Sequence, residues 1–153
     1  TASKKIKPGL IREKEARAKN IKRVKLSDTL LSQTEITVPH MLVENELDIL
    51  EARFTHDIKR LGLKVDEYLS HIKKTMADLR REWVPDAKKR SSLQLLIASI
   101  AHAEKISPAP EDIKKETVAV LSEHKDALRR RVENYVEMIL TNEKVFEFLE
   151  RQI

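Results

Sequence analysis

The chain has 153 residues, 36% of them charged, with a formal net charge of +5, two glycines and no cysteine. So few glycines exclude most β architectures, whose tight turns need glycine at positive φ. The lack of cysteine excludes a disulfide scaffold, a thiol nucleophile and a cysteine-based zinc site. The longest nearly apolar stretch, residues 93–103, is far shorter than the roughly 18 residues of a membrane-spanning helix, so no membrane partner is expected.

Positive charge is concentrated at the start of the chain. Residues 1–25 carry ten lysines and arginines against two glutamates, and the remaining residues are mildly acidic. Such an end can attract RNA, acidic surfaces or anionic lipid, or it can be a solvated helical arm. No aromatic residue lies within residues 1–53, so the stacking platform of single-strand nucleic-acid readers is missing.

The first predicted helix covers residues 8–33, with Pro8 in its first turn. Residues 1–7 are expected to be an artificial leader or a disordered start. Apolar residues are sparse in the first half of this helix and become frequent only from Ile21 onward. A helix half without an apolar stripe gains little from packing, so we expect that half to be exposed or to lie against something outside this chain.

The second predicted helix begins near Pro39, because proline disfavours helix at the residue before it and suits the first helical position. Its apolar residues recur every three or four positions, which predicts one narrow packing stripe. They are Val43, Leu47, Leu50, Phe54, Ile58 and Leu61. Gly62 stands where a left-handed helix cap is expected.

A short helix is predicted over residues 65–72, followed by a long one that extends toward Lys105. Thr75 and Asp78 have the spacing of a capping box at the start of the long helix. Pro85 lies inside this pattern and predicts a kink or a break near Val84.

Ser107-Pro108-Ala109-Pro110 is a predicted hinge, after which helices are expected over residues 110–124 and 126–152. The last helix has apolar residues at spacings of three, four and seven, which predicts its buried stripe. These residues are Leu128, Val132, Tyr135, Ile139, Phe146, Leu149 and Ile153.

No motif predicts catalysis. None of the five histidines has a second histidine three or four residues away, and the sequence lacks the Gly-x-Ser-x-Gly motif of a nucleophile elbow. With two glycines, a phosphate-binding loop is not expected. We therefore predict no catalytic residue, no metal site and no cofactor, and a protein that is not an enzyme.

Apolar residues outside the stripes are the remaining candidates for function. They form either the second side of a multi-helix core or an exposed lining for apolar partners, to which methionine is well suited because it is flexible. The selected candidates are Met41, Leu42, Ile49, Met76, Trp83, Val84, Met138 and Phe148. Val136 and Val145 were also placed outside the stripe of the last helix.

The order of these features resembles the C-terminal domain of bacterial trigger factor, a ribosome-associated chaperone. The resemblance rests on Ile36-Thr37-Val38-Pro39, on Leu42-Val43-Glu44-Asn45-Glu46-Leu47-Asp48, and on Gly62-Leu63 followed by Tyr68-Leu69. It extends through Leu79-Arg80-Arg81-Glu82, Ala87-Lys88-Lys89-Arg90 and the apolar residues 93–100 to Lys144-Val145-Phe146-Glu147-Phe148-Leu149.

The resemblance implies an elongated all-α fold over residues 8–153, with a body and two helical arms formed by residues 39–106 and 110–152. It implies an ATP-independent cytoplasmic chaperone domain that holds unfolded or nascent polypeptides on apolar arm faces, with the eight selected residues as contacts. The chain would be a fragment of a longer protein, whose ribosome-docking and prolyl isomerase domains lie outside it.

Two alternatives remain open from the sequence. One is a basic helical module that binds RNA or the ribosome through residues 4–25. The other is a helical scaffold that forms a homodimer through residues 128–153.

Overall fold

The computed structural model describes residues 2–152, with side chains for residues 9–152. Within that part of the chain the structure consists of six helices and no strand, so the predicted all-α class is confirmed. Thr1, Ile153 and the side chains of Lys4, Lys5 and Lys7 lie outside the described residues.

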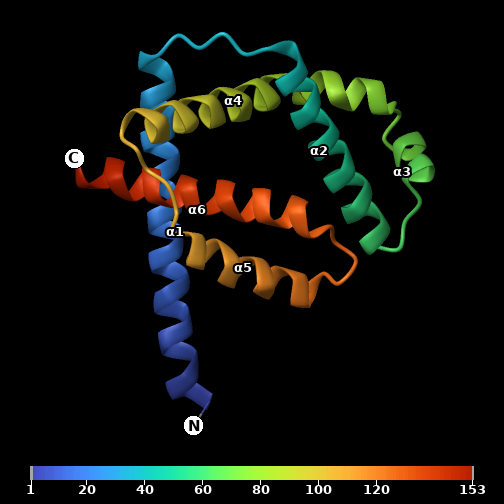
Figure 1. Cartoon of the computed structure of the whole chain (residues 1–153). Helices are drawn as coiled ribbons and strands as arrows, with labels where there is room; N and C mark the ends of the chain where they lie inside the picture. The colour runs from blue at the N-terminus through green and yellow to red at the C-terminus, as the bar shows by residue number, and fades with distance from the viewer. Residues whose placement is uncertain (1, 153) are drawn as a thin grey trace. The chain divides into compact units, whose positions relative to one another are not determined.

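The helices are α1 (Ala2–Gln33), α2 (His40–Arg60), α3 (Val65–His71), α4 (Met76–Ala103), α5 (Pro110–Glu123) and α6 (Arg129–Arg151) (Figure 1). The chain divides into two compact units. Unit 1 contains the described parts of residues 1–29 and 97–153, and unit 2 contains residues 30–96. Both α1 and α4 therefore continue from one unit into the other.

Proline marks two helix starts as predicted. Pro39 is the N-cap of α2, and Pro110 is the first residue of α5. Two other predicted starts were wrong. Helix α1 begins at Ala2 and continues through Pro8, and α6 begins at Arg129 because Leu128 is extended, with φ −72° and ψ 121°.

The predicted left-handed cap of α2 is confirmed. Gly62 has φ 78°, its N–H donates to the Lys59 carbonyl at 2.9 Å, and the Leu63 N–H donates to the Ile58 carbonyl at 3.2 Å. This pair of bonds satisfies carbonyls that the helix end leaves without partners. Helices α3 and α4 end in the same way with Lys73 at φ 57° and Lys105 at φ 52°.

The capping box at the start of α4 is also confirmed. The Thr75 N–H donates to Asp78 Oδ2 at 2.9 Å, and the Asp78 N–H donates to Thr75 Oγ1 at 3.2 Å. These hydrogen bonds from Thr75 lower the pKa of Asp78. A break at Pro85 was one of two predicted outcomes and does not occur, because α4 is continuous from Met76 to Ala103. Val84 and Ala87 on either side of Pro85 belong to the packed core of unit 2, which holds the helix together there.

The core of unit 2 lies between α2 and the first part of α4. Val43, Leu47 and Ala87 are buried together. The partly buried residues that pack against them are Val38, Leu50, Trp83 and Val84. At the other end of α2, the Phe54 ring lies 5.7 Å from the Trp83 ring and 5.8 Å from the Tyr68 ring of α3. These aromatic contacts join the three helices of the unit.

In unit 1, α5 and α6 form an antiparallel pair connected by a short turn (Figure 1). The buried face of α6 contains Val132, Val136 and Val145, whereas Leu128, Tyr135 and Ile139 are exposed. The predicted stripe of this helix was therefore wrong in most of its first half, where Val136 is buried and only Val132 was placed correctly. In the second half, Val145 is buried although it was predicted to lie outside the stripe.

None of the helices described here is long and apolar enough to cross a membrane.

Candidate functional site

The eight apolar candidates differ widely in exposure. Met41 is 73% exposed, Ile49 50% and Met138 38%. The remaining five are partly buried: Leu42, Met76, Trp83, Val84 and Phe148. Met41 and Ile49 lie on the same side of α2, about two helical turns apart. Met138 and Phe148 belong to α6 in the other unit, so the structure does not assemble the eight into one site within either unit.

Trp83 and Val84 are parts of the core of unit 2. Both pack against the cluster of Val43, Leu47 and Ala87, and Trp83 also contacts Phe54. Burial of this kind supports the fold and leaves little of either side chain for a partner. For these two residues the structure therefore favours a place in the multi-helix core over an exposed lining.

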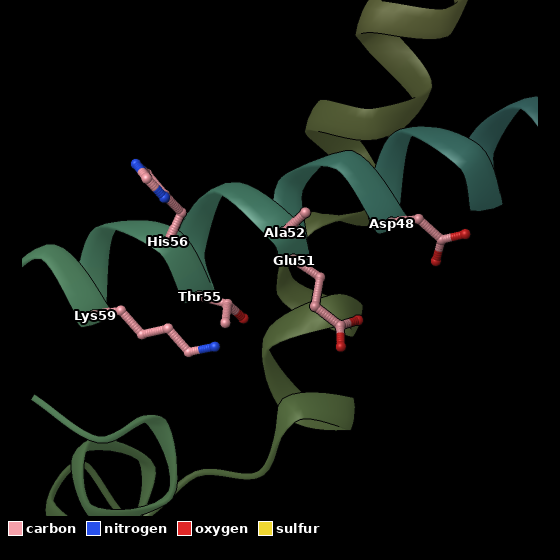
Figure 2. Close-up of a pocket in the computed structure, with 6 residues that line it drawn as sticks. All are labelled: Asp48, Glu51, Ala52, Thr55, His56 and Lys59. Atoms are coloured by element: carbon pink, nitrogen blue, oxygen red, sulfur yellow. The ribbon is translucent and has the colours of Figure 1, made fainter. Parts of the chain in front are cut away.

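Helix α2 contains a shallow depression of about 540 Å³. It is lined by Asp48, Glu51, Ala52, Thr55, His56 and Lys59. Figure 2 shows Glu51, Thr55 and Lys59 projecting from one side of the α2 ribbon and His56 from the opposite side. Ala52 is the one lining residue without a polar side chain. No group of this set is aligned with another as a nucleophile and its base would be.

Arg80 of α4 holds α2 through carboxylates, and two of them, Asp48 and Glu51, also line this depression. Its guanidinium pairs with Glu51 at 2.5 Å, with Glu44 at 3.0 Å and with Asp48 at 3.0 Å. The hydrogen bond to Glu51 is the largest cause of the raised pKa of Arg80. This network fixes α4 on α2 and thereby orients the face of α2 that carries Met41 and Ile49.

The first half of α6 exposes an apolar face of which only Met138 was predicted as a candidate. Leu128, Tyr135, Met138 and Ile139 are all exposed, Tyr135 by 56%. Leu128 lies just before the helix, and Met138 and Ile139 follow Tyr135 by three and four residues, which places these three on one side of α6. The sequence does contain a signal for this face: the segment has more apolar residues than one packing stripe can hold, so some of them must be exposed.

A groove of about 940 Å³ runs along α1 in unit 1. Its lining combines the apolar side chains of Ala18 and Leu26 with Lys22 and Lys25. Glu15 and Glu150 stand at this groove, together with Lys19 and Thr29. The groove is therefore amphipathic and rich in lysine.

Arg23 joins α1 to α6 beside this groove. Its guanidinium donates to Glu143 at 2.5 and 2.9 Å and to Glu150 at 2.7 Å, and it lies 5.3 Å from the centre of the Phe146 ring. Lys19 adds a second ion pair to Glu143 at 3.3 Å. The hydrogen bond from Arg23 is the main reason that the pKa of Glu143 falls to about 2.

The described side chains contain no group of three or more His, Asp or Glu residues placed to hold a metal ion. What the geometry offers is non-covalent: exposed apolar faces on α2 and α6 and a lysine-lined groove on α1. Surfaces of this kind bind other polypeptides through apolar burial and charge.

Comparison with known proteins agrees with this picture. The family described as "Bacterial trigger factor protein (TF) C-terminus" matches residues 2–150. The trigger factor of Trichodesmium erythraeum (strain IMS101) is 30% identical over 141 residues, which cover 91% of this chain and 29% of that protein. The trigger factor of Staphylococcus carnosus (strain TM300) is 29% identical over 111 residues, covering 72% of this chain and 25% of that protein.

The chain thus spans less than a third of the length of these relatives. No solved structure matches it significantly. The family match over nearly the whole chain confirms the resemblance drawn from the Thr-Val-Pro junction and the elements that follow it. The chain belongs to the family of bacterial trigger factor C-terminal domains.

Proposed function

We propose that this chain is an ATP-independent chaperone domain that holds unfolded or nascent polypeptides on exposed apolar faces. The observation that carries the proposal is the imbalance between surface and core. Among the described residues, large exposed hydrophobic side chains outnumber the buried hydrophobic ones, and they recur on α2 and α6. Family membership supports the same conclusion.

Two of the faces have the properties that an adaptable binding surface needs. The face of α2 contains Met41 and Ile49, and the face of α6 contains Tyr135, Met138 and Ile139, with Leu128 exposed just before the helix. A client segment that buries about 400 Å² of apolar surface gains roughly 10 kcal/mol before costs. Association and ordering cost about 4–15 kcal/mol, so one face binds weakly. Two faces that bind one client chain strengthen each other through effective concentration.

We place the activity in the cytoplasm, with polypeptide clients as the main partners. Ribosome binding and prolyl isomerase activity would belong to domains of a longer parent protein. The holding activity proposed for this chain requires neither a catalytic residue nor a cofactor, because it depends on apolar burial alone.

The test is suppression of aggregation of a chemically denatured enzyme by stoichiometric amounts of this chain. We expect the wild-type chain to slow light scattering. The combined variant M41S, I49S, Y135S and I139S should lose most of this protection, because it removes apolar surface from both faces without touching a core residue.

The matched control replaces exposed polar residues on the same two helices, in the variant R53S, D57S, E137S and K144S. This control should protect as well as the wild type. Failure of the wild-type chain to slow aggregation at a twofold excess would overturn the proposal, and so would equal loss of protection in both variants.

Homodimer formation is a second candidate use of the α6 face, favoured by the exposure of Leu128 and Tyr135. Sedimentation velocity over a wide concentration range would detect it. A mass that stays at the monomer value would exclude it, whereas a dimer that the change Y135S dissociates would support it.

A further inference from the structure

The groove on α1 differs from the faces of α2 and α6 in its charge. Lys22 and Lys25 line it, three residues apart and both exposed, above the apolar side chains of Ala18 and Leu26. Neither lysine forms an ion pair within the described part of the chain, whereas Lys19 is paired with Glu143. Of the two carboxylates at the groove, Glu150 is engaged by Arg23 and Glu15 is exposed.

The adjoining side of α1 shows what this kind of surface binds. There α6 presents Glu143, Phe146 and Glu150, spaced three and four residues apart. Arg23 takes both carboxylates and lies over the aromatic ring, as the hydrogen bonds and the ring distance above show. Helix α1 thus already binds a helix segment that presents two carboxylates and an aromatic ring, and the groove offers the same combination of cations and apolar surface next to it.

We propose that the groove on α1 binds acidic amphipathic segments of client polypeptides, with Lys22 and Lys25 pairing with carboxylates and Leu26 contacting an apolar or aromatic side chain. This inference rests on the proposed function, because the polypeptide that binds in the groove is taken to be a chaperone client. It adds a preference: segments with two carboxylates about two turns apart around an aromatic residue bind here, while neutral apolar segments bind on α2 and α6.

A polypeptide suits this groove better than a nucleic acid does. Ala18 and Leu26 in the lining favour apolar side chains of a partner, whereas a phosphate backbone would gain nothing from them. Residues 1–53 also lack the aromatic side chains on which bases stack. RNA binding nevertheless remains an outcome that the experiment below can detect.

The probes are two fluorescent peptides that repeat the pattern Glu-Ala-Ala-Phe-Ala-Ala-Ala-Glu or the same pattern with lysine in place of each glutamate. Fluorescence anisotropy measures their binding to the wild-type chain at low and at physiological salt. We expect the glutamate peptide to bind at least fivefold more tightly than the lysine peptide, and its affinity to fall as salt rises.

The test variant is K22E with K25E, and the control is K115E with K125E. Both change the charge by the same amount, and Lys115 and Lys125 are exposed residues of unit 1 that do not line the groove. We expect the test variant to weaken binding of the glutamate peptide at least fivefold and the control to weaken it less than twofold. Circular dichroism checks that both variants stay helical, and the milder variant K22Q with K25Q should lie between them.

Equal weakening by both variants would show general charge attraction and overturn the inference. The inference would also be overturned if a fluorescent 20-nucleotide RNA bound to the wild type and the control but not to the test variant, and if the glutamate peptide failed to displace that RNA. The inference and the proposed function fail separately. If neither peptide discriminates but aggregation is still suppressed, only the groove inference falls, whereas peptide binding without suppression contradicts the chaperone proposal.

Discussion

Arg23 and Glu143 are the residues through which α1 and α6 are most clearly tied together. Arg23 donates two hydrogen bonds to Glu143, one to Glu150, and contacts the Phe146 ring, all from a side chain that is only 14% exposed. Glu143 is 42% exposed, so water screens the pair and reduces its contribution to stability. The pair is nevertheless stronger than a simple surface ion pair, because its guanidinium binds the carboxylate with two hydrogen bonds.

This pair predicts how stability depends on pH. The pKa of Glu143 falls from its ordinary 4.5 to about 2 in the folded chain. A carboxylate with a lowered pKa stabilises the fold above its unfolded pKa and loses that effect as the pH falls through its folded pKa. The stability advantage of the wild type over the variant E143Q should therefore be constant near neutral pH and shrink between about pH 4.5 and pH 2.

Urea denaturation of both proteins at a series of pH values measures this advantage, which should be on the order of 1 kcal/mol at neutral pH. The exposed residue Glu147 provides the control, because E147Q should show no such pH-dependent difference. Parallel stability profiles of E143Q and the wild type over the whole range would contradict the assignment.

At the scale of helices, the ends of α2, α3 and α4 share one geometry but differ in sequence. Each ends with a residue at positive φ that allows two backbone bonds to close the helix: Gly62, Lys73 and Lys105. Glycine adopts this conformation without steric cost, whereas a residue with a Cβ pays roughly 1 kcal/mol for it. The lysine caps of α3 and α4 are therefore places where the sequence is not optimal for stability.

Replacing either lysine by glycine should stabilise the fold. We expect K73G and K105G each to raise the free energy of unfolding by about 0.5–1 kcal/mol, and G62A to lower it by about the same amount. Thermal or urea denaturation gives these values directly.

The control is K59G, which places glycine inside the last turn of α2, where it should destabilise by about 0.5–1 kcal/mol. If K73G and K105G destabilised the chain as K59G does, the assignment of a left-handed conformation to Lys73 and Lys105 would be wrong.

Helix ends were predictable where proline, glycine or a capping box decides them locally, but not at the starts of α1 and α6. Pro39, Gly62, the Thr75–Asp78 capping box and Pro110 all act within a few residues, and the structure follows each of them. Helix faces were less predictable because tertiary contacts choose among them. Helix α6 has apolar residues on most of its circumference, so only its packing in unit 1 shows that Val136 is buried and Tyr135 exposed.

The same reason explains which part of the candidate site was predicted. Met41, Ile49 and Met138 lie outside the core and are exposed, as a lining requires. In the sequence, Trp83 and Val84 cannot be distinguished from these three exposed residues. In the structure, however, they lie next to Ala87 on the side of α4 that packs against α2. Sequence periodicity identifies apolar positions, and the partner helix decides which of them remain available.

At the scale of the whole molecule, each of the two units has a small buried core and a helix with an exposed apolar face. Unit 2 exposes Met41 and Ile49 on α2, and unit 1 exposes Tyr135, Met138 and Ile139 on α6. In a monomer of this size such faces normally mark interaction sites. A domain with this division can bind one client chain at separate points without trapping it.

The three methionines allow the central claim to be tested residue by residue. Met41 and Met138 are exposed on the two proposed faces, and Met76 is partly buried at the start of α4. In a titration of methyl-labelled methionine with a permanently unfolded polypeptide, followed by NMR, the signals of Met41 and Met138 should shift or broaden while that of Met76 changes least. A stably folded protein of similar size and charge should leave all three unchanged. If the unfolded chain affected Met76 alone, or none of the three, the faces of α2 and α6 would not be the surfaces that hold clients.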